Sequence, residues 1–367
     1  MTLKVGIVSA NWGAFAHLPA WRSLPGVEVT GICTSRQETA EAAAAKFGIA
    51  RPFWDAEAMC ADPDIDIVDL GTRPSLRHAM VLAALRNGKH VYNGIPFAAN
   101  IDQARDMHRA WEAGGSIAVV DAYSQWLGSI QLLRARLEQG ALGRLFGGTC
   151  HFNMSLFNRP HPLFPYNWFH QAGLGVSAVR NLGSHALHIL VHLFGPVAEV
   201  VAHDTIVLDE WLFPDGDKII PETNDFANAL LRFANGMTLQ FQISWSAPLG
   251  EGFLLDVFGS NGRAVVSAPS FPTSRDTELR VGTLGGTLEV VPTPADLQRC
   301  DGVGLDWDSQ PPPAYPMAVS MRAMVDAIEG RGKAAPDFEQ AWQVERVQEA
   351  IRRSNLERRW VKIDEIE

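Results

Sequence analysis

ADPDIDIVDLGTRPSLRHAMVLAALRNGKHV, residues 61–91, contains two short apolar runs with a helical segment between them. Residues 65–70 are predicted to form a strand, residues 76–87 a helix that ends at Asn87-Gly88, and residues 90–92 the next strand. Two strands joined by one helix form a parallel pair, because the chain must cross back over the sheet before the second strand begins. The stretch therefore predicts an α/β fold.

The same alternation continues on both sides of this stretch. Strands are predicted at residues 3–8, 27–33 and 116–120, and helices at residues 15–24, 37–47 and 101–113. Strands that alternate with helices of about ten residues are typical of a doubly wound parallel sheet. Residues 1–122 are therefore predicted to form a Rossmann domain of the dinucleotide-binding kind.

The pattern changes from residue 143 onward, where runs of period two replace the alternation. These runs cover residues 198–202, 227–233, 237–245 and 254–259, and hairpin signals occur at Asn235-Gly236 and Ser260-Asn261-Gly262. Helices are predicted at residues 129–138, 185–193 and 318–328, with a loop at residues 301–316. Residues 123–367 are therefore predicted to form a second, α+β domain with a large, open, mostly antiparallel sheet.

The composition limits the classes of partner. The chain has 367 residues, which is too many for one compact core, and 47% hydrophobic residues, which is ordinary for a globular protein. The net charge of −10 argues against nucleic acid or an acidic membrane as the main partner. The four cysteines lack CxxC spacing, and no membrane-spanning run or signal peptide is visible. A cytoplasmic location is expected.

Several segments in this order resemble one known family. They are VGIVSANWGAFAHLPAW at residues 5–21, the stretch quoted above, GALGRLFGG at 140–148, GSNGRAVV at 259–266 and WQVERVQEAIRRSNLERRWVKI at 342–363. Together they resemble the glucose–fructose oxidoreductase / inositol dehydrogenase / MocA (Gfo/Idh/MocA) family of NAD(P)-dependent oxidoreductases. The resemblance covers nearly the whole chain. It implies a nicotinamide cofactor and a small-molecule substrate such as a polyol, a sugar derivative or a cyclic hydroxy or keto compound. It also implies that the second domain, residues 123–367, binds substrate and mediates oligomerisation.

The first turn departs from the GxGxxG pattern that receives a pyrophosphate. The matching positions hold Ser9, Asn11 and Ala14, and Gly13 lies one place early. Ser9 and Asn11 are small, and asparagine tolerates left-handed backbone angles. Two interpretations remain: the turn binds a cofactor although its motif is weaker than usual, or it is a strand-to-helix turn that binds nothing.

At the end of the second strand an acidic residue normally selects NAD. This chain has Thr34-Ser35-Arg36 instead, which suits a 2′-phosphate, although such residues also begin ordinary helices. NADP or NAD is expected, with NADP favoured, and the alternative is no cofactor. The predicted cofactor-binding residues are Ser9, Asn11, Trp12, Gly13, Thr34, Ser35, Arg36, Thr72, Pro74, Gly94 and Pro96.

The resemblance also implies catalytic positions. The family carries Glu-Lys-Pro where this chain has Gly94-Ile95-Pro96, so an isoleucine replaces the lysine that hydrogen-bonds the reacting hydroxyl. The family's aspartate becomes Asn181, and its histidine is retained as His185. Since acid–base help is worth roughly 10²–10⁴-fold in rate, we expect catalysis to depend on His185, with Asn181 orienting substrate. Tyr92 and Tyr123 are candidate replacements for the lysine.

Histidines form a second pattern. His185, His188 and His192 share one helical face, and His151, His161 and His170 precede them among aromatic residues. A bound metal could act as a Lewis acid there. A helical face of histidines more often serves packing and hydrogen bonding than metal binding. No ligand spacing such as HExxH is present, so no metal site is predicted.

Two surfaces and three functions remain as expectations. The aromatic loop at residues 152–173 covers a substrate pocket or packs at a subunit interface, and the second sheet's open face forms a homodimer or homotetramer. The leading function is an atypical NAD(P)-dependent oxidoreductase. The alternatives are a non-catalytic ligand- or cofactor-binding regulator, for which sugar-pathway repressors built on this fold are a precedent, and a non-redox lyase, isomerase or hydrolase that uses the histidines.

Overall fold

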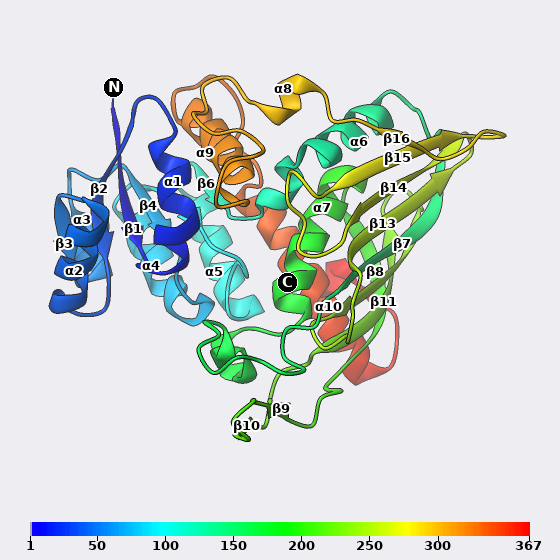
Figure 1. Ribbon diagram of the computed structural model, residues 1–367, viewed down its shortest axis with the longest axis horizontal. Coiled ribbons are helices and arrows are strands. Elements are labelled where there is room, and N and C mark those ends of the chain that lie inside the picture. The colour runs from blue at the N-terminus through cyan, green and yellow to red at the C-terminus, as the bar shows by residue number, and fades with distance from the viewer. Residues whose placement is uncertain (1) are drawn as a thin grey trace. The chain divides into compact units, whose positions relative to one another are not determined.

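The computed structural model describes residues 2–367 (Figure 1) and divides into two compact units. The first comprises Met1–Trp126 and Gln298–Trp342, and the second comprises Leu127–Leu297 and Gln343–Glu367. The predicted boundary at residues 122/123 lies close to the first crossing, but residues 298–342 return to the first unit. The cause is packing: α9 (Ala314–Ile328) lies against α1 (Leu18–Arg22), where its apolar side chains are buried.

The first unit contains a six-stranded, all-parallel sheet in the order β3-β2-β1-β4-β5-β6. The strands are β1 (Leu3–Val8), β2 (Val27–Cys33), β3 (Arg51–Phe53), β4 (Ile67–Leu70), β5 (His90–Asn93) and β6 (Ala118–Val120). All four residues of β4 are buried, as expected for a parallel strand that is covered on both faces. The predicted Rossmann architecture is confirmed. The prediction missed β3, since three residues that include a proline carry no periodic signal.

Helices connect these strands. They are the π-helical turn η1 (Gly13–His17) that continues into α1, and then α2 (Gln37–Phe47), α3 (Ala56–Ala61), α4 (Pro74–Arg86) and α5 (Ile101–Glu112). Asp55 and Asn100 cap α3 and α5, because their side-chain oxygens accept backbone N–H groups of the first turn. Helix α2 ends at Gly48, whose φ of 62° favours glycine.

The second unit contains a nine-stranded sheet in the order β16-β15-β14-β13-β7-β12-β11-β8-β17. The strands are β7 (Leu145–Asn153), β8 (Val197–Thr205), β11 (Phe226–Phe233), β12 (Thr238–Ser244), β13 (Gly252–Gly259), β14 (Gly262–Ala268), β15 (Glu278–Thr283), β16 (Glu289–Val291) and β17 (Val361–Lys362). Every pair is antiparallel except β7 with β12. The predicted mostly antiparallel sheet is confirmed, and both predicted hairpin turns join neighbouring strands.

Helices α6 (Gly128–Glu138) and α7 (Ser184–Phe194) lie along one face of this sheet, together with the later part of α10 (Phe338–Glu357), as Figure 1 shows. Among the described residues 2–367, no helix lies on the other face of this sheet (Figure 1). A separate two-stranded ribbon consists of β9 (Trp211–Leu212) and β10 (Lys218–Ile219).

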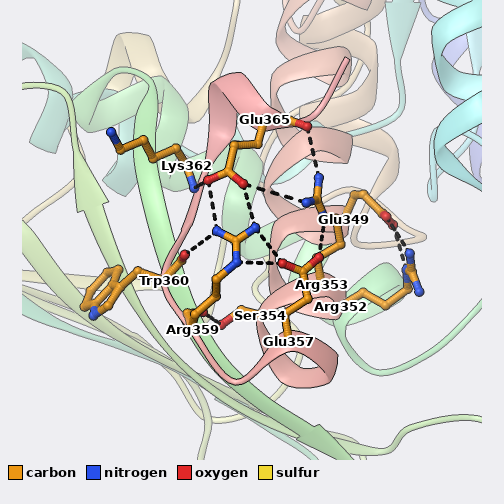
Figure 2. A network of polar contacts seen from close by, with 9 residues as sticks. All are labelled: Glu349, Arg352, Arg353, Ser354, Glu357, Arg359, Trp360, Lys362 and Glu365. Carbon is orange, nitrogen blue, oxygen red and sulfur yellow. Dashed lines mark hydrogen bonds and ion pairs between the residues drawn. The ribbon is translucent and has the colours of Figure 1, made fainter.

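An ion-pair network holds the C-terminal strand in place (Figure 2). The guanidinium of Arg359 contacts the carboxylates of Glu357 and Glu365, at 2.5 and 2.6 Å, where the chain leaves α10 and enters β17. The hydrogen bond from Arg359 lowers the pKa of Glu365 to about 2. Because these groups are exposed, their attraction is screened. The network thus contributes little to stability, and its main effect is to orient the chain, so that Val361 pairs with Val200 of β8.

Across residues 2–367, none of the helices is both long and apolar enough to cross a lipid bilayer.

Candidate functional site

The predicted cofactor-binding residues gather at one edge of the first unit's sheet. They follow the carboxyl ends of β1, β2, β4 and β5, and these ends share an edge because the strands are parallel. The strand order reverses between β1 and β4, which are neighbours in the sheet but not in the sequence. Ligands of open α/β sheets bind at such a switch point. The sheet therefore places these residues where a dinucleotide would bind.

The turn after β1 keeps one close-packing glycine, at a shifted position. A Cβ on Gly13 would lie 2.8 Å from Ile7 Cγ2, and a Cβ on Gly71 would lie 3.0 Å from Gly13 Cα. Both glycines are therefore required for the close approach of the turn to β4. The helix starts at Gly13 with a π-helical turn. Such a turn contains one extra residue, so a helix that begins one place early can regain its register.

The polar residues of this turn are compatible with a pyrophosphate. Ser9 Oγ accepts the backbone N–H of Asn11 at 3.1 Å, and Asn11 is exposed. No bulky side chain occupies the two positions where the family has its first glycines. The turn thus has small residues at these positions and an internal hydrogen bond to Ser9.

Behind the turn lies a buried charged cluster that the sequence analysis missed. His17 Nδ1 is 2.8 Å from Asp69 Oδ1 in β4, and His17 Nε2 is 3.0 Å from Asp121 Oδ2 after β6. Burial by itself lowers the pKa of His17, but the two carboxylates outweigh it and raise the pKa to about 10. His17 is therefore an imidazolium at neutral pH. The available signal was an aspartate within the apolar strand IVDL and another directly after AVV.

Three further donors complete the cluster. Trp21 Nε1 donates to Asp69 at 2.6 Å, while Trp12 Nε1 and the Tyr92 hydroxyl donate to Asp121 at 3.2 and 3.1 Å. Tyr92 has 0% exposure, and burial, followed by Asp121, raises its pKa well above the ordinary value. A phenol in this position is a fixed hydrogen-bond donor, which argues against its predicted role as a substitute for the lysine.

Tyr123, the other candidate substitute, lies in the short 3-10 turn η2 (Tyr123–Trp126) and is 4% exposed. That turn packs against α9. The catalytic role of Tyr123 remains a prediction.

The turn after β5 contains a buried guanidinium. Arg77 of α4 is fully buried and donates to Asn93 Oδ1 at 3.4 Å and to the carbonyl oxygen of Pro96. Ile95 is partly buried and packs against the apolar core. A guanidinium does not lose its proton in proteins. Arg77 therefore holds the turn but cannot replace the lysine as an acid or base.

The residues after β2 show no negative charge. Thr34 Oγ1 lies 2.6 Å from Thr39 Oγ1, and Thr39 Oγ1 donates to the carbonyl of Arg36. Ser35 and Arg36 are exposed at the start of α2. The adenosine end of the sheet edge therefore offers hydroxyls and one guanidinium.

In the second unit, Asn181 and His185 lie on adjoining turns of one helical segment. Asn181 belongs to a π-helical turn, η5 (Val179–Gly183), and His185 to the first turn of α7. Turns of this type are frequent at functional sites. Asn181 is half-buried, and His185 is 8% exposed, with its ring edge-on to Phe271 at a centroid distance of 4.8 Å. The amide and the imidazole are thus placed by one rigid element.

Of the other two histidines of that face, His188 is fully buried and His192 is half-buried. Burial, followed by the charge of His185, lowers the pKa of His188 to about 3. Burial, followed by Arg134, lowers the pKa of His192 to about 4, and His192 lies 2.8 Å from Arg134 Nη1. Within residues 2–367, the histidine, cysteine and acidic side chains form no group of three that could hold a metal.

The aromatic loop is anchored by its own side chains. Phe157 is fully buried and stacks on Trp211 at a centroid distance of 3.9 Å, and Trp245 meets it edge-on. Leu163 and His161 remain exposed. Whether the exposed part covers a substrate or meets a subunit stays a prediction.

Known proteins match the chain in both units. The family described as an oxidoreductase family with an NAD-binding Rossmann fold matches residues 3–122, and the GFO/IDH/MocA C-terminal domain matches residues 130–265. The D-apiose dehydrogenase of Paraburkholderia graminis is 28% identical, covering 80% of this chain and 73% of that protein. The levoglucosan dehydrogenase of Pseudarthrobacter phenanthrenivorans is 24% identical over 99% of both chains. Among solved structures, an NAD-binding oxidoreductase from Klebsiella pneumoniae superposes with a TM-score of 0.88 at 25% identity, covering 99% of each chain.

Proposed function

Because the chain belongs to the Gfo/Idh/MocA family of NAD-binding oxidoreductases, we propose that it oxidises or reduces a polyol, a sugar derivative or a cyclic hydroxy or keto compound. The observation that carries this proposal is the set of small and polar residues at the β1/β4 switch point, together with His185 and Asn181 on one helical segment. Relatives named for D-apiose and levoglucosan support a polyhydroxylated substrate.

Each residue has a role in this proposal. A bound nicotinamide supplies the hydride acceptor or donor. The Asn181 amide, which has both a donor and an acceptor, orients a substrate hydroxyl. The His185 imidazole takes the hydroxyl proton during oxidation and returns it during reduction, for which a histidine is suited near neutral pH.

The cofactor in this proposal is NADP in preference to NAD. What supports it is the absence of an acidic side chain in Thr34-Ser35-Arg36 and the exposure of Arg36, which could pair with a 2′-phosphate. Binding of NADPH and NADH is measured by calorimetry for the wild type, Arg36→Ala and the control Lys46→Ala, an exposed cation at the far end of α2. We expect only Arg36→Ala to weaken NADPH binding, by about tenfold. Equal losses for NADH and NADPH would remove the preference.

One preparation tests the catalytic proposal. Mass spectrometry of the purified protein looks for co-purified NAD(P), and nicotinamide absorbance is followed with a panel that includes D-apiose, levoglucosan and inositols. We expect turnover that falls at least 10²-fold in His185→Ala and is unchanged in Lys46→Ala, which alters the exposed cation at the far end of α2. The proposal fails if neither dinucleotide binding nor turnover is found.

A regulatory protein is the second candidate. The observation that favours it is the turn at Gly94-Ile95-Pro96, where an aliphatic side chain and a fixed guanidinium leave no acid or base. Dinucleotide binding without turnover on the whole panel, with sugar binding detectable by calorimetry, would favour this candidate over the enzyme.

We further propose that the chain forms a homodimer or homotetramer through the helix-free face of the second unit's sheet. Phe146, Leu230 and Phe258 are 46%, 41% and 45% exposed there, around a hollow of about 430 Å³. Light scattering should show an oligomer that Phe258→Glu reduces to a monomer. Leu356→Glu, which alters an exposed leucine of α10, is the matched control.

A further inference from the structure

The carboxylate of Asp121 contacts both ends of the turn that follows β1. In the sheet order, β6 is separated from β1 by β4 and β5. Nevertheless Trp12 Nε1 and His17 Nε2 both reach the same oxygen of Asp121, at 3.2 and 3.0 Å. Trp12 is the N-cap of the π-helical turn and His17 is its last residue, so one carboxylate ties both ends of the turn to the residue that follows β6.

The carboxylate is a firm anchor. It is 3% exposed, its second oxygen accepts the hydroxyl of Tyr92, and His17 beside it stays protonated at neutral pH. Hydrogen bonds that involve ionised groups are shorter and stronger than neutral ones. The carboxylate of Asp121 therefore accepts hydrogen bonds from three side-chain donors, and the indole of Trp12 is one of them.

Trp12 links this buried cluster to the exposed edge of the sheet. It directly follows Asn11, its own side chain is half-exposed, and its ring lies 6.0 Å from that of Phe15, which is 57% exposed. Its backbone already has helical angles. The residue next to the predicted pyrophosphate position is thus fixed from behind by a charged hydrogen bond.

We propose that Trp12 is a positioning residue, whose Nε1–H bond to Asp121 holds the glycine-poor turn in the conformation that receives the pyrophosphate of the dinucleotide. This inference rests on the dinucleotide binding proposed above. If packing of the ring were sufficient, removing only the N–H group would not change the affinity.

Trp12→Phe keeps an aromatic ring and removes the donor, and a matched control corrects for the smaller size of the phenylalanine ring. The matched control is Trp111→Phe, which deletes an indole hydrogen bond of the same kind, from Trp111 Nε1 to the carbonyl of Ser116, at the opposite end of β6. Dissociation constants for NAD(P)H are measured by calorimetry, with dinucleotide KM and kcat measured in parallel. We expect about tenfold weaker binding and a matching rise in KM for Trp12→Phe, with kcat changed less than twofold and Trp111→Phe unchanged.

A second variant tests the acceptor of this hydrogen bond, and a spectroscopic readout reports on the folded protein directly. Asp121→Asn keeps an oxygen for the indole but removes its charge, and it should weaken binding in the same direction. In nitrogen-15 spectra, the indole signal of Trp12, assigned by its loss in Trp12→Phe, should shift on addition of dinucleotide while that of Trp111 does not.

The outcomes separate this inference from the proposed function. Wild-type binding with an equal or tighter constant for Trp12→Phe overturns the inference and leaves the function standing. A wild type that binds no dinucleotide overturns both.

Discussion

The guanidinium of Arg77 lies against the backbone of Gly94, so closely that a Cβ on Gly94 would be 2.6 Å from Nη1 of Arg77. Arg77 is fully buried and donates to the carbonyl oxygen of Pro96, in the turn that Gly94 begins. The missing side chain at position 94 and the buried cation are therefore one arrangement: glycine leaves the space that the guanidinium fills.

Gly94→Ala tests that arrangement. The added methyl group must displace Arg77 or the turn, and overpacking of this kind costs about 1–3 kcal/mol of unfolding free energy. The measurement is urea denaturation, with Gly114→Ala as the control, because its Cβ would meet no atom closer than 3.6 Å. Equal stability of the two variants would contradict the close contact.

Ile95→Lys tests the missing lysine. The resemblance places a lysine at this position, and Ile95 is only partly buried, so the stem of a lysine can lie along the core with its ammonium group toward solvent. If the protein is an oxidoreductase, kcat should rise about 10²-fold on the best substrate of the panel. Ile95→Met, which lengthens the side chain without a charge, should give no gain. If the Ile95→Lys variant folds and binds dinucleotide but has an unchanged kcat, the side chain at position 95 does not face the reacting hydroxyl.

His17 predicts a pH dependence of stability. Its pKa is raised from 6.5 to about 10 in the folded chain, so the folded state holds one more proton than the unfolded state between these values. The contribution of His17 to the free energy of unfolding is therefore complete below pH 6.5 and is lost as the pH rises toward 10, with an upper limit of about 5 kcal/mol.

Urea denaturation at pH 6, 8 and 9.5 measures this contribution. The stability gap between the wild type and His17→Gln should be largest at pH 6 and should narrow at each step. His161→Gln, at an exposed histidine, should show a small gap that does not vary in this way. If the difference in unfolding free energy between the wild type and His17→Gln stays constant with pH, His17 is not charged.

Phe271 predicts the accessibility of His185. The two rings meet edge-on at 4.8 Å, and His185 is only 8% exposed. Phe271→Ala should increase the rate at which diethylpyrocarbonate modifies His185, measured by mass spectrometry of peptides. The rate at His161 in the same sample serves as the internal control, and an unchanged His185 rate would mean that other groups shield the imidazole.

Sequence periodicity was sufficient for the fold because periodicity is a local property. Residues 3–8, 27–33 and 37–47 were predicted with the bounds that β1, β2 and α2 have in the structure. Predicted cofactor residues also fell at one sheet edge, since parallel strands bring their carboxyl ends together whatever the loops contain. The return of residues 298–342 to the first unit was not predicted, because the sequence of an amphipathic helix shows which face is apolar but not which element packs against that face.

The chemistry within the first unit depended on contacts between distant segments. His17 is 52 residues from Asp69 and 104 from Asp121, and each of these residues taken alone resembles an ordinary polar residue near a turn. Charge state and burial are properties of the surroundings, not of the residue type, so they were decided only when the strands were placed side by side. For the same reason Tyr92 was a plausible proton donor by sequence, and only packing made it a buried partner of Asp121. The amino-acid sequence thus determined the elements, their order and the family, whereas tertiary structure decided which polar groups meet.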